Sequence, residues 1–115
     1  MLLVDDDESL QRALARALRL TGFQVEVFSS AEALLARGVH ERDDCLVLDV
    51  DLPGMDGFAC LRMLEASGRY LPTVFITALL PAEVRDPIAA GKSIEVLYKP
   101  FNKEDLIAAI ERACA

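Results

Sequence analysis

The sequence predicts an α/β fold in which a five-stranded parallel sheet is doubly wound by five helices. The first observation behind this prediction is a set of five short apolar runs, each bounded by polar or turn-forming residues. The second is the helical spacing of apolar residues in the segments between these runs. The third is that four of the runs end at residues suited to phosphate or metal chemistry. Ligands of open α/β sheets bind outside the carboxyl ends of the strands, which fits this placement.

The predicted strands occupy residues 2–4, 24–28, 45–48, 73–77 and 94–98. Most of them are nearly continuous in apolar character, as strands buried on both faces are, whereas the second alternates like a half-exposed strand. The alternation of strands with helical segments implies right-handed crossovers around a parallel sheet.

The first two helices are predicted from apolar spacing and from residues that start or stop helices. The stripe and stop of the first helix are Leu10, Ala13, Leu14, Ala17, Leu18 and Gly22. Ser29 and Glu32 have the spacing of a capping box for a short second helix, which Gly38 ends.

The third and fifth helices have clear boundaries, whereas the fourth has little support. The third is predicted between Gly57 and Gly68, with Phe58, Leu61, Met63 and Leu64 as its apolar residues. Asn102 is expected to cap the fifth, with Phe101 and Leu106 at staple positions and Leu106, Ile107, Ile110 and Ala113 facing inward. Residues 82–91 hold only Val84 and Ile88 as large apolar positions, and Pro87 would break or restart a helix there.

Length and composition exclude several classes of function. A chain of 115 residues suits one domain, so residues 1–115 are predicted to form a single unit. The net charge of −7 argues against direct nucleic-acid binding, which depends on clustered Lys and Arg. Cys45, Cys60 and Cys114 are widely spaced and fit reduced thiols better than a disulfide framework or a zinc site. The sequence contains no signal peptide, lipidation motif or long apolar run, which predicts a soluble, cytoplasmic chain without membrane contact.

The polar residues at the strand ends also have purely structural interpretations. The run Asp5-Asp6-Asp7 could cap the first helix, where carboxylates accept backbone N–H bonds. Thr77 is a common strand residue, and a lysine at a strand end is usually solvated. Their joint occurrence at four strand ends is what favours a functional site.

These motifs resemble the receiver domains of two-component response regulators over essentially the whole chain. The matching segments are residues 3–7, 46–57, 75–78 and 99–101, in the order in which receivers carry them. Residues 31–35 and 71–78 are more similar to receivers with helix-turn-helix output domains of the nitrogen-fixation-regulator type. The resemblance implies a flavodoxin-like sheet with strand order 2-1-3-4-5 and a signalling domain, not an enzyme.

The resemblance also implies a role for each motif residue. Asp49 would be the phospho-acceptor, Asp5 and Asp6 the acidic pair, and Thr77 the switch hydroxyl. Lys99 would be the invariant lysine of the family.

A divalent cation follows from the same chemistry. A carboxylate attacks phosphorus poorly while its charge and the phosphoryl oxygens repel each other, so the site needs a cation between them. Mg²⁺ prefers oxygen ligands in octahedral geometry. The expected ligands are the carboxylates of Asp6 and Asp49 and the backbone carbonyl of Asp51, with Asp5 acting directly or through water. Lys99 would hold a phosphoryl oxygen as a point charge.

The partners implied by the resemblance are a sensor histidine kinase and an output domain beyond residue 115. Homodimerisation on phosphorylation is also a property of such domains. The surface expected to switch comprises the fourth helix, the fifth strand and the fifth helix.

Two other functions remain open at this point. The sequence Asp49-Val50-Asp51 also resembles the nucleophile motif of haloacid-dehalogenase-type phosphatases, in which the second Asp is the general acid. That family needs a longer chain and an acidic pair after the lysine, where this chain has only Glu104, Asp105 and Glu111 on a helix. A pseudo-receiver, an interaction module that is never phosphorylated, is the other alternative. Turnover of a phosphomonoester would support the first, and failure to bind Mg²⁺ the second.

The chain departs from the receiver pattern on its output side. Val96 stands three residues before Lys99, where receivers usually carry the Tyr or Phe that couples to the switch hydroxyl. Tyr98 lies on the same strand face by alternation. The stretch from Gly91 to Lys99 is one residue longer than usual, and the resemblance implies a cis bond before Pro100.

Overall fold

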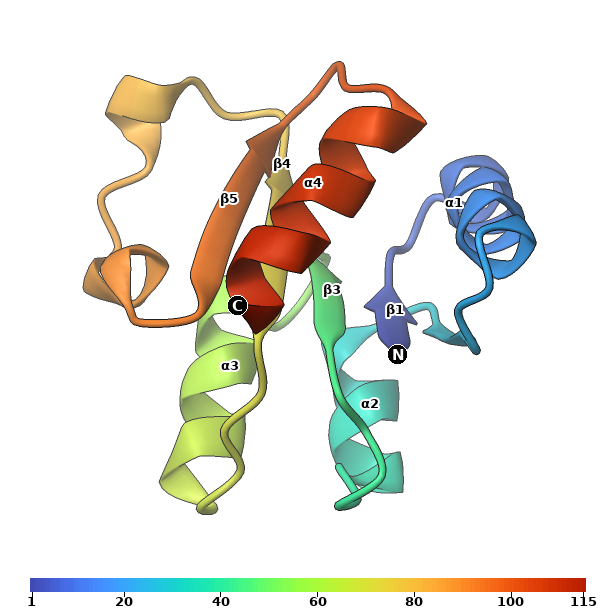
Figure 1. The fold of residues 1–115 in the computed structure, drawn as a ribbon. Coiled ribbons are helices and arrows are strands. Elements are labelled where there is room, and N and C mark those ends of the chain that lie inside the picture. Colours follow the sequence, from blue (N-terminus) through green and yellow to red (C-terminus); the bar gives the residue numbers. More distant parts are fainter.

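The computed structural model of the chain describes residues 1–115. Its five strands are all parallel and lie in the order β2-β1-β3-β4-β5, which confirms the predicted sheet (Figure 1). Their bounds are Leu2–Val4 for β1, Glu26–Phe28 for β2, Leu46–Asp49 for β3, Thr73–Thr77 for β4 and Ile94–Tyr98 for β5. The strand ends that carry the polar motifs therefore lie along one edge of the sheet.

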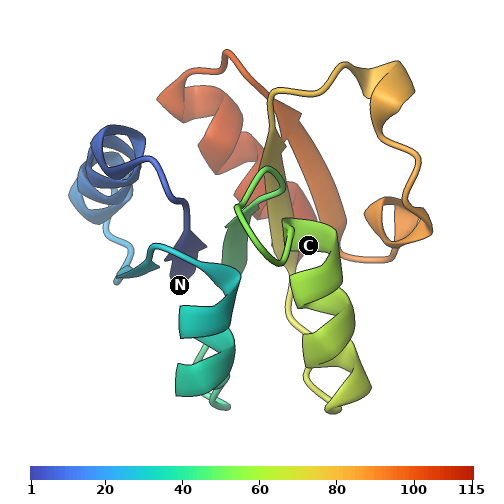
Figure 2. The same ribbon diagram turned by 180° about the vertical axis from the view of Figure 1, so that it is seen from behind.

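Four α-helices cover the two faces of the sheet. Figure 1 and Figure 2 show α1 (Glu8–Leu20) and α4 (Lys103–Cys114) on one face and α2 (Ala31–Arg37) and α3 (Gly57–Ala66) on the other. Each face has its own apolar layer, because neighbouring residues of a strand point to opposite sides. Leu48 and Phe75 pack in the layer under α2 and α3, and Val47 and Ile76 in the layer under α1 and α4.

The predicted fourth helix is wrong: the segment between β4 and β5 contains no α-helix. It holds two 3-10 turns, η1 at Pro81–Glu83 and η2 at Pro87–Ala90. Proline has no N–H to donate in a helix interior, and it disfavours helical geometry in the residue before it. Asp86 accordingly has an extended backbone, and its carboxylate accepts a hydrogen bond from the N–H of Ile88.

The apolar stripe predicted for the first helix is only partly correct. Leu14 and Leu18 are buried, but Ala13 is exposed, and Gln11 and Ala15 are buried instead. Gln11 is buried because its amide donates to two backbone carbonyl oxygens, those of Asp5 at 3.1 Å and Phe28 at 2.9 Å. A polar side chain with such partners can replace an apolar one in the core.

The helix ends also differ in detail from the predictions. Ser30, not Ser29, caps α2, and its hydroxyl accepts from the N–H of Ala33. Glu32 does not complete a capping box. Met63 of α3 is 51% exposed, contrary to its predicted place with the apolar residues. The capping of α4 by Asn102 is confirmed.

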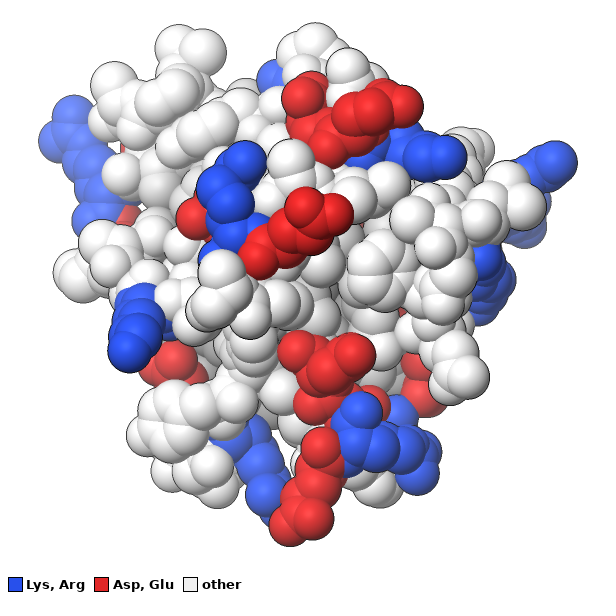
Figure 3. Space-filling model, viewed as in Figure 1, with Lys and Arg blue, Asp and Glu red and all other residues white.

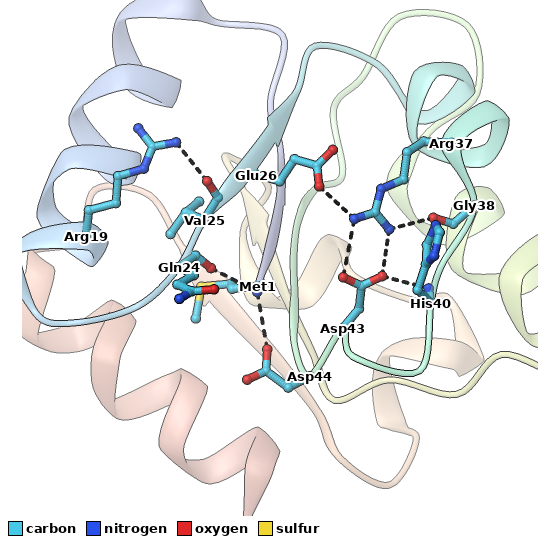
Figure 4. Close-up of polar contacts among 10 residues, drawn as sticks. All are labelled: Met1, Arg19, Gln24, Val25, Glu26, Arg37, Gly38, His40, Asp43 and Asp44. Atoms are coloured by element: carbon cyan, nitrogen blue, oxygen red, sulfur yellow. Dashed lines mark hydrogen bonds and ion pairs between the residues drawn. The ribbon is translucent and has the colours of Figure 1, made fainter.

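The amino-terminal edge of the sheet is held by ion pairs, which Figure 4 shows. Arg37 at the end of α2 donates to Asp43 at 2.7 Å and to Glu26 of β2 at 2.6 Å. The terminal amine of Met1 lies 3.3 Å from a carboxylate oxygen of Asp44. These contacts lie at the opposite edge from the polar motifs, so they stabilise the fold without entering the candidate site.

The surface carries charges of both signs. On the face shown in Figure 3, basic and acidic side chains are interspersed among uncharged ones and form no continuous basic area.

Cys45 and Cys60 are buried free thiols, and Cys114 is an exposed one. None of the helices has both the length and the apolar character that a bilayer crossing requires.

Candidate functional site

The register of the sheet brings the four polar motifs together. Val4 pairs with Leu48, so Asp5 and Asp49 come at matching positions of adjacent strands β1 and β3. The pairing of β3 with β4 and of β4 with β5 then puts Thr77 and Lys99 at the same edge. The N–H of Lys99 donates to the carbonyl oxygen of Thr77 at 2.8 Å, which continues the ladder to the site.

Three carboxylates form an acidic cluster at this edge, made by Asp5, Asp6 and Asp49. One oxygen from each lies within 4.8 Å of the other two. Asp5 and Asp49 are almost wholly buried, with exposed fractions of 0% and 2%, whereas Asp6 is exposed. The Oδ1 atom of Asp5 accepts from the N–H of Asp7 at 2.9 Å, but its Oδ2 atom is buried without any hydrogen-bond partner.

Burial changes the acidity of the two inner carboxyl groups. The pKa of Asp5 is raised to about 6, mainly by burial and also by the charge of Asp49, although the hydrogen bond from the N–H of Asp7 acts in the opposite direction. The pKa of Asp49 is also raised, mainly by burial, although the N–H of Asp51 and the ammonium of Lys99 act in the opposite direction. These buried acids therefore favour a cation nearby, which would stabilise their charged forms.

The acidic cluster fits a hard divalent cation such as Mg²⁺. It offers oxygen ligands from three carboxylates, and the buried Oδ2 atom of Asp5 has no hydrogen-bond partner within the protein. Asp6 lies at the solvent side, which leaves room for the waters that Mg²⁺ usually retains. The side chain of Asp51 is not part of this cluster.

Lys99 and Thr77 complete the edge of the site. The Nζ atom of Lys99 lies 4.0 Å from Oδ1 of Asp49, with the lysine side chain 29% exposed. Thr77 is fully buried, and its hydroxyl donates to the carboxylate of Asp51 at 3.3 Å. The peptide bond between Lys99 and Pro100 is cis, as expected. The arrangement thus combines a buried carboxylate, an acidic cluster that could hold a cation, an ammonium and a hydroxyl.

Comparison with known families decides what this arrangement belongs to. Residues 1–111 match the response regulator receiver domain family. The chain is a member of that family. Receivers are signalling domains of two-component systems, which agrees with the function class predicted from the motifs.

The relatives of this receiver include longer regulatory proteins. Response regulator protein TmoT of Ectopseudomonas mendocina is 39% identical over 113 residues, and the DNA-binding transcriptional regulator NtrC of Salmonella typhimurium is 32% identical over 110. Each alignment covers 96% of this chain, but only 50% of TmoT and 24% of NtrC. This receiver therefore spans half of the length of TmoT and about a quarter of the length of NtrC.

Solved receiver structures share the fold closely. FixJ-N superposes with a TM-score of 0.85 at 36% identity, covering 98% of this chain and 90% of that one. Chemotaxis protein CheY4 of Vibrio cholerae gives a TM-score of 0.85 at 28% identity, covering 97% of this chain and 95% of CheY4. The flavodoxin-like strand order predicted from the resemblance is thus confirmed.

Two contacts shape the loop of this receiver between β3 and α3. Gly57 lies so close to the end of β3 that a Cβ atom there would be 3.0 Å from Cα of Val50 and closer still to the carbonyl oxygen of Asp49. The carboxylate of Glu32 in α2 accepts a hydrogen bond at 3.3 Å from the N–H of Met55, which lies in the loop itself. Both contacts hold the loop that carries Asp51 next to the acidic cluster.

Sequence reasoning missed these positioning residues. In the sequence, Gly57 indicates a helix boundary and Glu32 has the spacing of a capping-box residue. The glycine-rich turn after Asp49 indicates a tight loop, but only the folded chain brings Glu32 to it. The sequence likewise indicates no partner for the side chain of Asp51, because Thr77 is 26 residues away along the chain.

Proposed function

We propose that residues 1–115 form the receiver of a two-component system and accept a phosphoryl group on Asp49 from a phosphohistidine of a sensor kinase. The observation that carries this proposal is the buried acidic cluster with Lys99 4.0 Å from Asp49. Oxygen ligands for a cation and a separate ammonium beside one carboxylate are the parts that phosphoryl transfer to a carboxylate needs.

The transfer requires Asp49 to act as a nucleophile. One of its carboxylate oxygens attacks phosphorus while the phosphorus–nitrogen bond breaks and the imidazole leaves with the electron pair, giving an acyl phosphate. Mg²⁺, when held by Asp5, Asp6, Asp49 and the backbone carbonyl of Asp51, supplies the charge shielding that lets two anions approach. Lys99, whose Nζ atom lies 4.0 Å from Asp49, would neutralise a phosphoryl oxygen.

The expected readout is a change at the end of β4. The acyl phosphate brings new acceptor oxygens, to which the hydroxyl of Thr77 turns. The surface that responds comprises residues 79–91, β5 and α4, and we call it the output face. It would control an output domain beyond residue 115 or a second copy of the chain, in the cytoplasm where the kinase domain acts.

The test of this function is chemical labelling. Acetyl phosphate with Mg²⁺ is expected to add one phosphoryl group, measured by intact mass, and peptide mapping is expected to place it on Asp49. Asp49→Ala is the matched control and should remain unlabelled. Full labelling of that variant would overturn the assignment, and turnover of a phosphomonoester by the wild type would favour the phosphatase alternative instead.

Lys99→Ala separates the roles of metal and lysine. Because an ammonium is not a metal ligand, this variant should bind Mg²⁺ at least as tightly as the wild type while labelling falls. A variant that folds but no longer binds Mg²⁺ would contradict the role proposed for Lys99.

The geometry gives no support to the phosphatase alternative. Asp105, one of the few acidic residues after the lysine, is engaged at the start of α4, where its carboxylate accepts from the N–H of Asn102 at 3.2 Å. Asp51, the general acid of that alternative, accepts hydrogen bonds at the end of β4.

A further inference from the structure

The side chain of Asp51 contacts the end of β4. Its Oδ2 atom accepts from the hydroxyl of Thr77 at 3.3 Å and from the backbone N–H of Ala78 at 3.2 Å. Asp51 itself is exposed, so solvation alone would satisfy its charge, and no burial forces it into this position. One carboxylate thereby binds two donors on the neighbouring strand end.

The Thr77 hydroxyl is held in one orientation by this contact. Its oxygen accepts from the N–H of Leu79 at 3.0 Å, so its single proton is free to point to Asp51. The hydroxyl therefore connects the carboxylate to the first residues of the segment between β4 and β5. If the Thr77 hydroxyl turned to donate to another acceptor in place of Asp51, its hydrogen bond from the N–H of Leu79 would also be disturbed.

A phosphoryl group on Asp49 would be next to the same two donors. Asp49 pairs with Ile76 across β3 and β4, which puts Thr77 and Ala78 immediately beyond its partner in the ladder. A phosphoryl group carries several strong acceptor oxygens and a charge near −2, so its needs match what the Asp51 carboxylate now takes. Both groups are anions that seek N–H and O–H donors.

We propose that the carboxylate of Asp51 is an internal competitor of the phosphoryl group for the Thr77 hydroxyl and the Ala78 N–H. This proposal rests on the phosphorylation of Asp49 proposed above. In the unphosphorylated protein, Asp51 occupies the two donors and holds the end of β4. Phosphorylation displaces it, both through competition for the donors and through repulsion between the two anions. Asp51 thus raises the threshold for the active state.

The test measures binding of beryllofluoride, a phosphoryl analogue, to wild type, Asp51→Ala and Asp51→Asn at saturating Mg²⁺. Asp51→Ala frees both donors and removes the charge, so the dissociation constant should fall about tenfold, as expected for loss of a competing charged hydrogen bond. Asp51→Asn keeps an acceptor oxygen without the charge. Its dissociation constant should therefore lie between those of the wild type and Asp51→Ala, about threefold below the wild type. The backbone carbonyl proposed as a metal ligand is retained in both variants.

Equal or weaker binding by Asp51→Ala would overturn the proposal, since Asp51 would then be neutral or helpful to the bound group. Asp49→Ala, which lacks the acceptor, should not bind beryllofluoride. If the wild type also fails to bind it, the proposed function is wrong. The contact between Asp51 and Ala78 can still be tested in the unliganded protein. Without Mg²⁺ or analogue, the Ala78 amide should shift in the NMR spectrum of Asp51→Ala and exchange faster with solvent. An unchanged Ala78 amide would show that the contact is absent.

Discussion

At the scale of single residues, three consecutive aspartates take different roles. Asp7 caps α1, because its Oδ1 atom accepts from the N–H of Leu10 at 3.2 Å. Asp5 is buried in the acidic cluster, and Asp6 joins the cluster from the solvent side. The sequence predicted both a cap and a metal site for this run, but could not divide the roles. Which aspartate caps the helix and which join the cluster depends on the direction that the backbone takes after β1. Three identical side chains in a row give no information about that direction.

This division makes Asp6→Asn a clean test of the metal role. The variant should weaken Mg²⁺ binding at least tenfold and reduce labelling by acetyl phosphate, because it removes a charged ligand. The free energy of unfolding should change by less than about 0.5 kcal/mol, since Asp6 is exposed and does not cap the helix. Isothermal calorimetry with Mg²⁺ and urea unfolding measure the two quantities.

Asp7→Ala is the matched control at the next position. It removes the cap of α1 and should cost about 1 kcal/mol of stability, with Mg²⁺ affinity nearly retained. The metal role of Asp6 would be refuted if Asp6→Asn bound Mg²⁺ as the wild type does.

At the scale of elements, the sequence predicted strands better than helices. The bounds of β4 and β5 agree with the prediction, because short apolar runs between turn residues have few other structures open to them. The inward face of α1 was less predictable. An amphipathic pattern does not show that Gln11 finds two buried carbonyl oxygens on neighbouring segments. In the sequence, Pro87 and the scarcity of apolar residues around it already argued against an α-helix between β4 and β5.

The close approach of α3 to β3 is tested by Gly57→Ala. The added Cβ would be 3.0 Å from Cα of Val50, and backbone atoms there cannot move without shifting the loop that carries Asp51. Overpacking of this kind should destabilise the domain by about 1–3 kcal/mol and also weaken Mg²⁺ binding. Thermal unfolding and calorimetry measure the two effects.

Gly38→Ala provides the comparison at the opposite edge of the sheet. Gly38 has a φ of 78° and a ψ of 164°, so alanine should cost about 1–3 kcal/mol through backbone strain, although a Cβ there would meet no atom within 4 Å. Mg²⁺ binding should be unaffected. Equal loss of Mg²⁺ affinity in both variants would mean that Gly57 acts only through global stability.

The ion pair at the end of α2 predicts how stability depends on pH. Burial opposes ionisation of Asp43, but hydrogen bonds from Arg37 and from the N–H of His40 outweigh it and lower the pKa of Asp43. A carboxyl group whose pKa is lower in the folded state contributes stability above its unfolded pKa, near 3.9, and loses it as pH falls through the lower value. Asp43→Asn should therefore cost about 2 kcal/mol at pH 7 and progressively less below pH 4.

Glu26→Gln is the control for Asp43→Asn, because Glu26 contacts the same arginine from a side chain that is 50% exposed. It should cost less than about 0.5 kcal/mol at pH 7. Urea unfolding of the three proteins between pH 3 and 7 provides the data. A cost of Asp43→Asn that does not depend on pH would contradict the assignment to charge.

At the scale of the whole molecule, local sequence patterns did not determine the order of the strands. Alternating strands and helices predict a parallel sheet, but several orders satisfy right-handed crossovers. The order 2-1-3-4-5 was implied by the resemblance to receivers, and the structure has it. That order places β1 beside β3, which is why residues distant in sequence share one acidic cluster, and β4 beside β3, which brings Thr77 to the same edge.

The same strand order places the start of the segment between β4 and β5 next to the candidate site. This segment belongs to the output face. Its first residues are coupled to Thr77 by the hydrogen bond from the N–H of Leu79. Farther along, an ion pair between Asp86 and Arg62 ties it to α3. Val96 of β5 is partly buried against the core, and its β-branched side chain is too short and stiff to swing as an aromatic ring does. We therefore expect residues 79–91 to carry the larger response and β5 the smaller one.

We expect beryllofluoride with Mg²⁺ to cause its largest amide NMR shifts within residues 79–91, with smaller ones in β5. The physical reason is that movement of the Thr77 hydroxyl removes the partner of the Leu79 N–H, and a segment with only two short 3-10 turns resists such a change weakly. Val96→Ala should keep this pattern of shifts, whereas Arg62→Ala, which frees the segment from α3, should alter it. Sedimentation reports whether the activated domain dimerises. Dimerisation lost in Val96→Ala but unchanged in Arg62→Ala would show instead that the signal passes through β5.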